Sequence, residues 1–256
     1  EIIKFQFVKY ELKDGGVGYI RITRFGETTP ALVKNAVKNL VEKNNGKKLS
    51  GVILDLRNNP GGLLDVTHNV YSLFLNRDEY FLKSDNPSFD EVAGSRVTVS
   101  QERRGKILKD KYYINSSADI IDGAPLVVLV NAGSASASEI MAKTLQVYGR
   151  ALVAGPRKSF GKGTVQKIIP LQTGGALVLT ASQYLIGPEG CEQAIQNVGV
   201  IPDIVLKEDD AALKITREES KLSKSVATSA ISNENCKYRY EFPEEQREMV
   251  LQMLRV

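Results

Sequence analysis

Two stretches of this chain share one order: a short apolar run, a turn of small residues, and an amphipathic helix. "LSGVILDLR" precedes "NNPGG" and "LLDVTHNVYSLFL", and "APLVVLVN" precedes "AGSASASEIMAKTLQVYG". Short, continuous apolar runs bounded by turn residues are typical of strands that are buried on both faces of a sheet. The repeated strand, turn and helix predict an α/β fold.

The remaining periodic segments add strands at the start of the chain and a hairpin near its end. Residues 4–13 and 17–25 alternate in the manner of half-buried strands and are expected to be sheet neighbours. Residues 28–46, which open with Thr-Thr-Pro, predict a helix. "GTVQKIIPLQTGGALVLTASQYL" predicts a β-hairpin closed around residues 173–175, and "FPEEQREMVLQML" a last helix. Between them, residues 76–123 have weaker periodicity and predict short strands inside a long excursion.

The bulk properties fit a soluble globular protein and exclude several classes. The chain has 256 residues, 42% of them hydrophobic and 25% charged, so it can bury a sizeable core. A net charge of +4, with scattered positive residues, gives nucleic-acid binding no support. No apolar stretch reaches the roughly 18 residues that a membrane-spanning helix needs. Cys191 and Cys236 fit either a disulfide or two free thiols, and a start at Glu1 rather than Met suggests a processed or trimmed chain.

Three serines, Ser134, Ser136 and Ser138, stand where the second apolar run ends and its helix begins. Serine is a common N-cap, so a structural role is the default interpretation. A catalytic serine would require a positioned base, and the single histidine, His68, lies within a predicted helix, where we expect an exposed or partly packed residue. One histidine and no paired-cysteine spacing predict no metal site. A lysine is therefore the candidate base.

Lys162 is unusual among the basic residues, since it stands between two glycines in "SFGKGTVQ", directly before a predicted strand. A lysine can accept the proton of a serine if burial or nearby dipoles lower its pKa towards neutrality. Gly61 and Gly62 stand in a turn before a helix, where backbone N–H groups can bind an anion. Tight-turn geometry alone explains these two glycines equally well.

Four motifs together resemble one family, the carboxy-terminal processing (tail-specific) serine peptidases. They are "VILDLRNNPGG", "LVVLVNAGSASASEI", "YGRALVAGPRKSFGKGTVQ" and "GVIPDIVL", and the resemblance spans residues 17–206. It implies a crotonase/ClpP-like αβ sheet-and-helix core with β-hairpin additions, and a serine endopeptidase that cleaves polypeptides near their C-terminus. It also implies no cofactor, and an extracytoplasmic location such as a periplasm, a lumen or a membrane surface.

The resemblance assigns a role to each matching residue. The middle serine, Ser136, corresponds to the nucleophile, and Lys162, between its glycines, to the general base. Gln166, four residues later on the predicted strand, is expected to orient the lysine amine. Ser134 and Ser138 keep structural roles in the turn and the helix start.

The same resemblance implies an oxyanion hole at the two turns. Its donors would be the amide of Ala137 and an amide of the Gly-Gly turn, either Gly61 or Gly62. Preorganised N–H groups of this kind each lower the barrier by roughly 3 kcal/mol. Glu139, in the first turn of the predicted helix, either helps to hold Lys162 or only complements the helix dipole.

We expect two parts, a Ser-Lys peptidase core at 1–206 and a polar C-terminal segment at 207–256. The family carries a PDZ domain before the strand that "GYIRI" resembles, and the roughly 15 residues preceding that strand here are too few for one. The last helix is expected to pack on the core or to join another protomer in a homo-oligomer. Two alternatives stay open: a crotonase-like enzyme that binds an acyl thioester, and an inactive binding module on the same fold.

Overall fold

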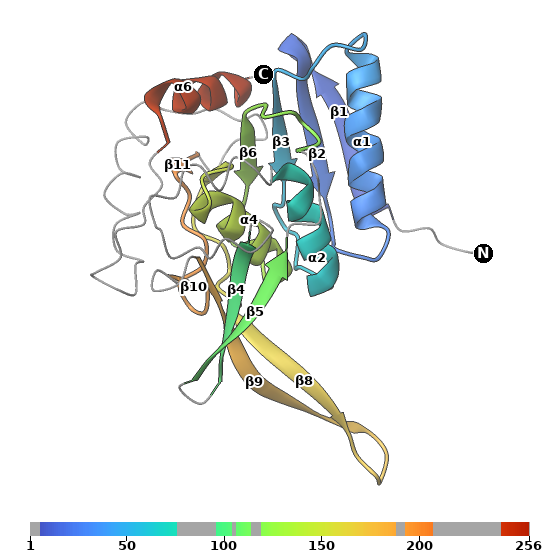
Figure 1. Cartoon of the computed structure of the whole chain (residues 1–256), viewed down its shortest axis with the longest axis vertical. Coiled ribbons are helices and arrows are strands. Elements are labelled where there is room, and N and C mark those ends of the chain that lie inside the picture. Colours follow the sequence, from blue (N-terminus) through green and yellow to red (C-terminus); the bar gives the residue numbers. More distant parts are fainter. Residues whose placement is uncertain are drawn as a thin grey trace, which may run out of the picture.

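A mixed six-stranded sheet forms the centre of the protein in the computed structural model, which describes residues 6–75, 96–103, 106–113, 119–187, 193–206 and 242–255 (Figure 1). Its strands, in spatial order, are β1 (Val8–Lys13), β2 (Val17–Ile22), β3 (Gly51–Asp55), β6 (Leu126–Leu129), β7 (Leu152–Gly155) and β11 (Ile204–Val205). The β1 strand is antiparallel to β2, and every other neighbouring pair is parallel. All residues of β3, β6 and β7 are buried, as their apolar sequences predict.

Helices cover both faces of this sheet. On one face lie α1 (Thr29–Lys43), α2 (Leu64–Tyr71), continued by a 3₁₀ turn at Ser72–Phe74, and α4 (Ala137–Val147). On the other lies α6 (Glu244–Met253), whose Val250 and Met253 pack against Ile53 and Val127 (Figure 1). Because side chains alternate along a strand, Val52 and Leu54 contribute to the first core while Ile53 contributes to the second.

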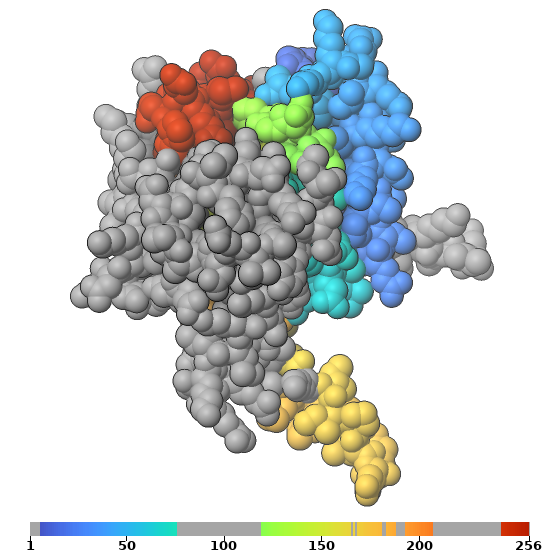
Figure 2. Space-filling model, in the orientation of Figure 1, coloured from blue at the N-terminus to red at the C-terminus, as the bar shows by residue number. Residues whose placement is uncertain are grey.

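A second, antiparallel sheet extends from the body. Its strand order is β10 (Gln193–Ala194), β9 (Ala176–Ile186), β4 (Arg96–Arg103) and β5 (Lys106–Tyr113), and β8 (Thr164–Pro170) pairs with residues 176–183 of β9. The β8–β9 hairpin reaches well beyond the other elements and forms an arm that projects from the molecule (Figures 1 and 2). This arm begins two residues after Lys162.

The α/β architecture expected from the sequence is confirmed, with changes at element boundaries. The second strand ends at Ile22 rather than residue 25, and the helix expected over 63–75 ends as a 3₁₀ turn. The hairpin around residues 173–175 and the last helix are present, and that helix packs on the sheet. Cys191, Cys236 and most of 76–123 and 207–241 lie outside the described residues. Within the described part, no helix has the length and apolar character needed to span a membrane.

Candidate active site

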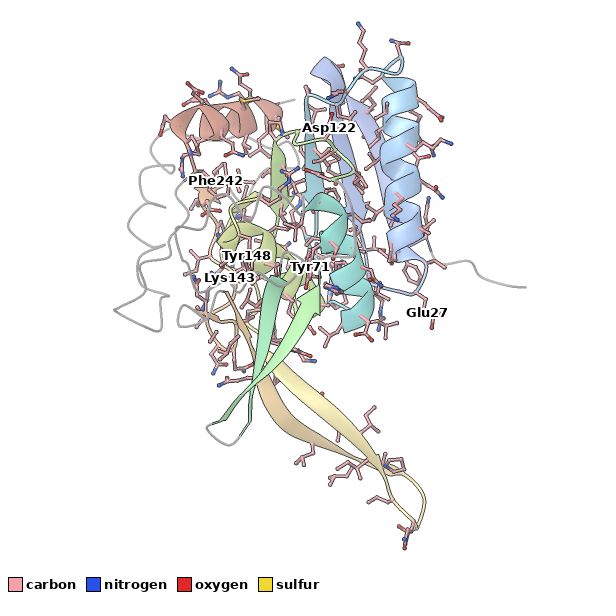
Figure 3. The ribbon with its side chains drawn as sticks, in the orientation of Figure 1. Glu27, Tyr71, Asp122, Lys143, Tyr148 and Phe242 are labelled. Atoms are coloured by element: carbon pink, nitrogen blue, oxygen red, sulfur yellow. The ribbon has the colours of Figure 1, made fainter. Side chains whose placement is uncertain are left out.

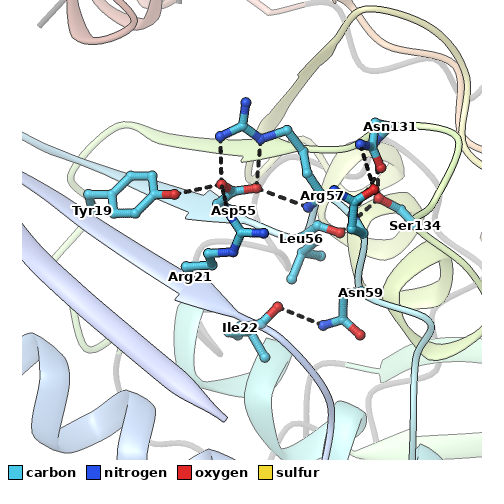
Figure 4. Close-up of polar contacts among 10 residues, drawn as sticks. Tyr19, Arg21, Ile22, Asp55, Leu56, Arg57, Asn59, Asn131 and Ser134 are labelled. Atoms are coloured by element: carbon cyan, nitrogen blue, oxygen red, sulfur yellow. Dashed lines mark hydrogen bonds and ion pairs between the residues drawn. The ribbon is translucent and has the colours of Figure 1, made fainter. Parts of the chain in front are cut away.

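The turns that follow β3 and β6 lie side by side, because the two strands are parallel neighbours and end at the same edge of the sheet. The carbonyl oxygen of Asn59 accepts hydrogen bonds from Ala135 N (3.0 Å) and from Ser138 Oγ (2.9 Å). In the same direction, Ser134 Oγ donates to the carbonyl oxygen of Leu56 at 2.8 Å (Figure 4). Together with two hydrogen bonds between Asn58 and Asn131, these bonds fix one turn against the other.

Gly61 brings the first turn into direct contact with the start of α4. Its φ is 102°, a conformation that favours glycine. A Cβ atom at this position would lie 2.8 Å from Ala135 O, 2.9 Å from Ala137 N and 3.0 Å from Ser136 Cβ. Its own N–H is occupied, since it donates to Asn59 Oδ1 at 2.9 Å. The close approach therefore requires glycine, and the amide of Gly61 serves the turn itself.

The neighbouring amides of Gly62 and Ala137 are placed differently. Phe25 N donates to Gly61 O, and Leu63 N donates to Phe25 O, so Gly62 forms a parallel bridge with Phe25 and directs its own N–H away from that residue. Ala137 is the first residue of α4, where an N–H has no partner within the helix. The structure assigns neither amide an acceptor among the described residues.

Ser136 differs from its two neighbouring serines in backbone and in exposure. It has φ 56° and ψ −120°, the positive φ that non-glycine residues adopt uncommonly. Its side chain is half-buried, whereas Ser134 and Ser138 are fully buried and donate to main-chain carbonyls. Strained conformations of this kind occur preferentially at functional sites. A serine on a sharp strand-to-helix turn also presents its hydroxyl outward.

The carboxylate of Glu139 connects the Ser136 turn to the loop that carries Lys162. Glu139 Oε2 accepts hydrogen bonds from Ser136 N (2.9 Å) and from Lys162 N (2.8 Å). Its Oε1 atom accepts from Gly161 N (2.6 Å) and from Ser159 Oγ (2.5 Å). The nitrogens of Ser136 and Lys162 are thus no more than about 6 Å apart, since both bind one oxygen at hydrogen-bond distance.

Further bonds hold the lysine loop from its other side. Val200 N donates to Ser159 Oγ at 2.6 Å, and Asn197 N donates to Gly161 O at 2.9 Å. The side chain of Lys162 is exposed. Gln166 lies on β8 with an exposed side chain. The backbone of the loop is therefore fixed while the lysine side chain faces solvent.

Two further titratable groups, His68 and Lys143, lie on the helices that follow these turns. His68, expected to be exposed or partly packed, is buried on α2, and its Nδ1 atom lies 2.9 Å from Tyr71 Oη. Burial lowers the pKa of Lys143 on α4 to about 8, while the charge of Asp203 opposes this change (Figure 3). No group of three His, Cys, Asp or Glu side chains in the described part of the chain is arranged to hold a metal ion.

The sequence profile of peptidase family S41 matches residues 16–206. The chain belongs to peptidase family S41. A carboxy-terminal-processing protease of Bartonella bacilliformis is 40% identical over 208 residues, which cover 81% of this chain and 42% of that protein. A chloroplastic carboxyl-terminal-processing peptidase 3 of Arabidopsis thaliana is 38% identical over 187 residues, covering 73% of this chain and 31% of the relative. The chain therefore spans less than half the length of these two curated relatives.

Among solved structures, the photosystem II D1 C-terminal processing protease is similar to this S41 chain with a TM-score of 0.63 and 28% sequence identity. The match covers 89% of this chain and 54% of that protein. The family membership and the α/β core expected from the four motifs are thus confirmed.

Sequence reasoning missed a cluster of charged groups beside the first turn of this S41 domain. Asp55 is fully buried at the end of β3 and accepts hydrogen bonds from Tyr19 Oη (2.6 Å), Arg57 Nε (2.9 Å) and Arg57 Nη2 (2.7 Å), with Arg21 Nη1 at 3.6 Å (Figure 4). Burial alone would raise the pKa of Asp55, but the bonds from Arg57 and Tyr19 hold it below its usual value. The available signal was a lone acid in the apolar run "VILDL".

Ser159 was also missed, and no pattern in the sequence distinguishes it. Its hydroxyl donates to Glu139 and accepts from Val200, so it joins the lysine loop both to α4 and to the segment before β11. Such a residue is found only once the fold brings three distant segments together.

Proposed function

We propose that this chain is a serine endopeptidase that cleaves polypeptides near their C-terminus through an acyl-enzyme. The observation that carries the proposal is the strained backbone of Ser136 at the start of α4, packed against Gly61 and tied by Glu139 to the backbone of Lys162. This arrangement brings together the Ser136 hydroxyl, the backbone of Lys162, and the amides of Gly62 and Ala137, which have no acceptor among the described residues.

In the proposed first step, Ser136 Oγ attacks the carbonyl carbon of a peptide bond while its proton passes to the neutral amine of Lys162. The tetrahedral intermediate then collapses: the C–N bond breaks, the lysine returns the proton to the leaving amine, and an acyl ester remains on Ser136. A water molecule, deprotonated by Lys162, then attacks the ester carbon. The C–O bond to Ser136 breaks, the lysine returns the proton to Ser136 Oγ, and the product with the new carboxyl group is released. Gln166 on β8 is proposed to orient the lysine amine.

The amides of Gly62 and Ala137 are the proposed donors to the oxyanion. Gly62 is preferred to Gly61 because the Gly61 amide already donates to Asn59 Oδ1. The helix α4 adds to the effect, since its N-terminus carries a partial positive charge close to Ala137. Each donor is expected to lower the barrier by roughly 3 kcal/mol.

The exposed position of Lys162 bears on the same mechanism. Exclusion of water disfavours the charged form of an amine, so it makes a lysine a better base. A polypeptide lying over the site would remove that water, so we propose that substrate binding itself completes the base. The extracytoplasmic location implied by the family resemblance is kept as part of this proposal; one curated relative is named as chloroplastic.

The test is hydrolysis of an unfolded protein between about pH 5 and pH 10 by the chain and four variants. Activity should rise with pH as the amine loses its proton. Ser136→Ala and Lys162→Arg should be inactive, the latter because a guanidinium stays protonated. Gln166→Ala should lose less activity, and His68→Gln, checked for folding by circular dichroism, should keep both activity and pH profile.

Two results would contradict the proposal. An active Lys162→Arg enzyme would exclude lysine as the base. Failure of Ser136 to react with a serine-directed fluorophosphonate, together with absent hydrolysis, would favour the thioester-binding enzyme or the inactive binding module instead.

A further inference from the structure

Among the side chains that the structure describes, the exposed apolar ones are concentrated on the β8–β9 arm and next to two residues of the candidate active site. Leu63, 51% exposed, directly follows Gly62, and Phe160, 65% exposed, stands two residues before Lys162. Among the residues whose side-chain exposure the structure describes, a set that does not include β4 and β5, the other strongly exposed large apolar side chains lie on the β8–β9 arm, with Met249 on α6 as the exception. Apolar surface of this kind, gathered in one region, marks a binding site for another molecule.

The outer part of the arm, residues 168–180, is exposed throughout, whereas Tyr184 and Ile186 at its root are buried in the core. It projects from the body, and its side chains stand clear of the other elements (Figures 1 to 3). Beyond its root, residues 176–180 of β9 pair only with β8, because β4 and β10 pair with residues 183–186. Residues 168–180 also contain no charged side chain. An apolar, uncharged partner is therefore expected.

The two faces of the arm are distinct. Directly opposite residues share a face, and the pairs are Gln166 with Thr180, Ile168 with Val178, and Ile169 with Leu177. Since side chains alternate along a strand, Ile168 and Val178 lie on the face of Gln166, and Ile169 and Leu177 lie on the opposite face. Ile168 and Val178 are 71% and 56% exposed. We call the face that carries these two residues and Gln166 the proximal face.

We propose that the proximal face binds an extended, apolar segment of the polypeptide substrate at a distance from the scissile bond. This inference rests on the proposed function, which it deepens by naming a substrate feature. The face continues the candidate active site, because β8 begins two residues after Lys162 and Gln166 is shared by both. Leu63 and Phe160 extend the same apolar character to the position where the peptide bond would lie.

The geometry sets the position of that segment. Ile168 is six positions beyond Lys162, which corresponds to about 20 Å of extended chain at about 3.3 Å per residue. A substrate that follows the arm would therefore carry its apolar segment about six residues from the bond that is cut. Uncharged, apolar segments should be selected, since a charged side chain would lose its water there without gaining a partner.

The test uses Ser136→Ala protein, so that the probe is not consumed, and fluorescein-labelled peptides with a central Ala-Ala. In one peptide, Val-Leu-Val-Leu lies six residues before the centre, and in a second peptide it lies six residues after the centre. A third peptide carries Ser-Gln-Ser-Gln in place of the apolar segment. Fluorescence anisotropy gives each Kd. We expect one apolar peptide to bind at least about fivefold tighter than the polar one, as the burial of two aliphatic side chains implies.

A matched pair of variants separates the two faces. Ile168→Thr with Val178→Thr should remove the preference for the apolar peptide, whereas Ile169→Thr with Leu177→Thr should change each Kd less than about twofold. Threonine is β-branched, as strands favour, and the single change Val178→Thr provides a milder version.

Three results would overturn the proposal: equal binding of all peptides, equal effects of the two variant pairs, or a proximal-face variant that alters the oligomeric state by light scattering with unchanged Kd. The last result would assign the arm to contact with a second copy. Failure of the proposed catalysis would give a different result. The Ser136→Ala protein would still bind the peptides in a way that depends on the proximal face, while the protein with Ser136 intact would cleave no substrate.

Discussion

The turns after β3 and β6 pack against each other and both contain residues with positive φ, but they achieve this with different residue types. The first turn achieves its positive φ angles largely with glycine, at Gly61 and Gly62, and its side-chain bonds hold the turn in place. The second turn has a positive φ at Ser136, where glycine would be unstrained. We propose that serine is kept at this strained position because its hydroxyl is needed there, whereas the glycines of the first turn allow the two turns to approach closely.

Adding one carbon to the first turn is expected to have the largest effect. Gly61→Ala would place a methyl group against Ala135, Ser136 and Ala137, so the two turns must separate. We expect a loss of about 3 kcal/mol of stability and at least about a 100-fold loss of kcat/KM, since small misplacements of catalytic groups are costly.

Gly46→Ala is the matched control for that prediction. Gly46 has φ 74°, but nothing lies within 4 Å of the added carbon. Gly46→Ala therefore measures only the cost of placing alanine in a left-handed backbone conformation. It should cost about 1 kcal/mol and leave kcat/KM unchanged. Equal losses of activity in the two variants, measured by hydrolysis and urea unfolding, would show that contact between the turns is unimportant.

Glu139→Gln tests the anchor of the second turn. The amide keeps one acceptor oxygen but directs an NH₂ group at two of the four donors that the carboxylate serves. We expect a loss of about 2 to 3 kcal/mol of stability and about a tenfold or greater loss of kcat, because the lysine loop is released from Ser136.

Glu245→Gln, at an exposed acid in the first turn of α6, is the control for an effect of the helix dipole. It should change stability by less than about 1 kcal/mol and leave activity intact. If the two variants change stability and activity by similar amounts, Glu139 acts only as a first-turn acid that interacts with the helix dipole.

Asp55→Asn tests the anchor of the first turn and has a defined pH dependence. The folded-state pKa of Asp55 lies below its usual value of 3.8, so the ionised carboxylate stabilises the fold above that pH and the contribution is lost as pH falls through the folded pKa. At pH 7 we expect a loss of about 2 kcal/mol, since Arg57 keeps its charge without a full partner.

Thermal unfolding from pH 7 down to pH 2.5 would check this sign. The difference in Tm between the two proteins should narrow below about pH 4, where the wild-type carboxyl begins to take up its proton. A constant difference over the whole range would mean that shape rather than charge at position 55 matters.

The comparison of the turns also shows what sequence could and could not predict. Apolar runs and glycines predicted β3, β6 and the helices after them, because burial and turn geometry leave local patterns. The motif at Ser136 and Lys162 predicted both candidate residues. The sequence offered a contact between Glu139 and Lys162 as one alternative, but the contacts of Asp55 and Ser159 could not be predicted, because they join segments 20 or more positions apart. Nor did any local pattern predict that Lys162 is exposed.

Ser136→Gly has the smallest expected effect on stability. It distinguishes the contribution of backbone strain at Ser136 from the contribution of the hydroxyl. Glycine accepts φ 56° without steric cost, while alanine keeps the strain of the serine. Strained backbone of this kind costs about 1 to 3 kcal/mol, and glycine loses about 0.5 to 1 kcal/mol through the entropy of the unfolded chain. Both variants should therefore be inactive, but Ser136→Gly should be about 1 kcal/mol more stable than Ser136→Ala by urea unfolding. If glycine is instead the less stable of the two, the backbone at Ser136 is not under strain, and the contrast between the two turns lies in the hydroxyl alone.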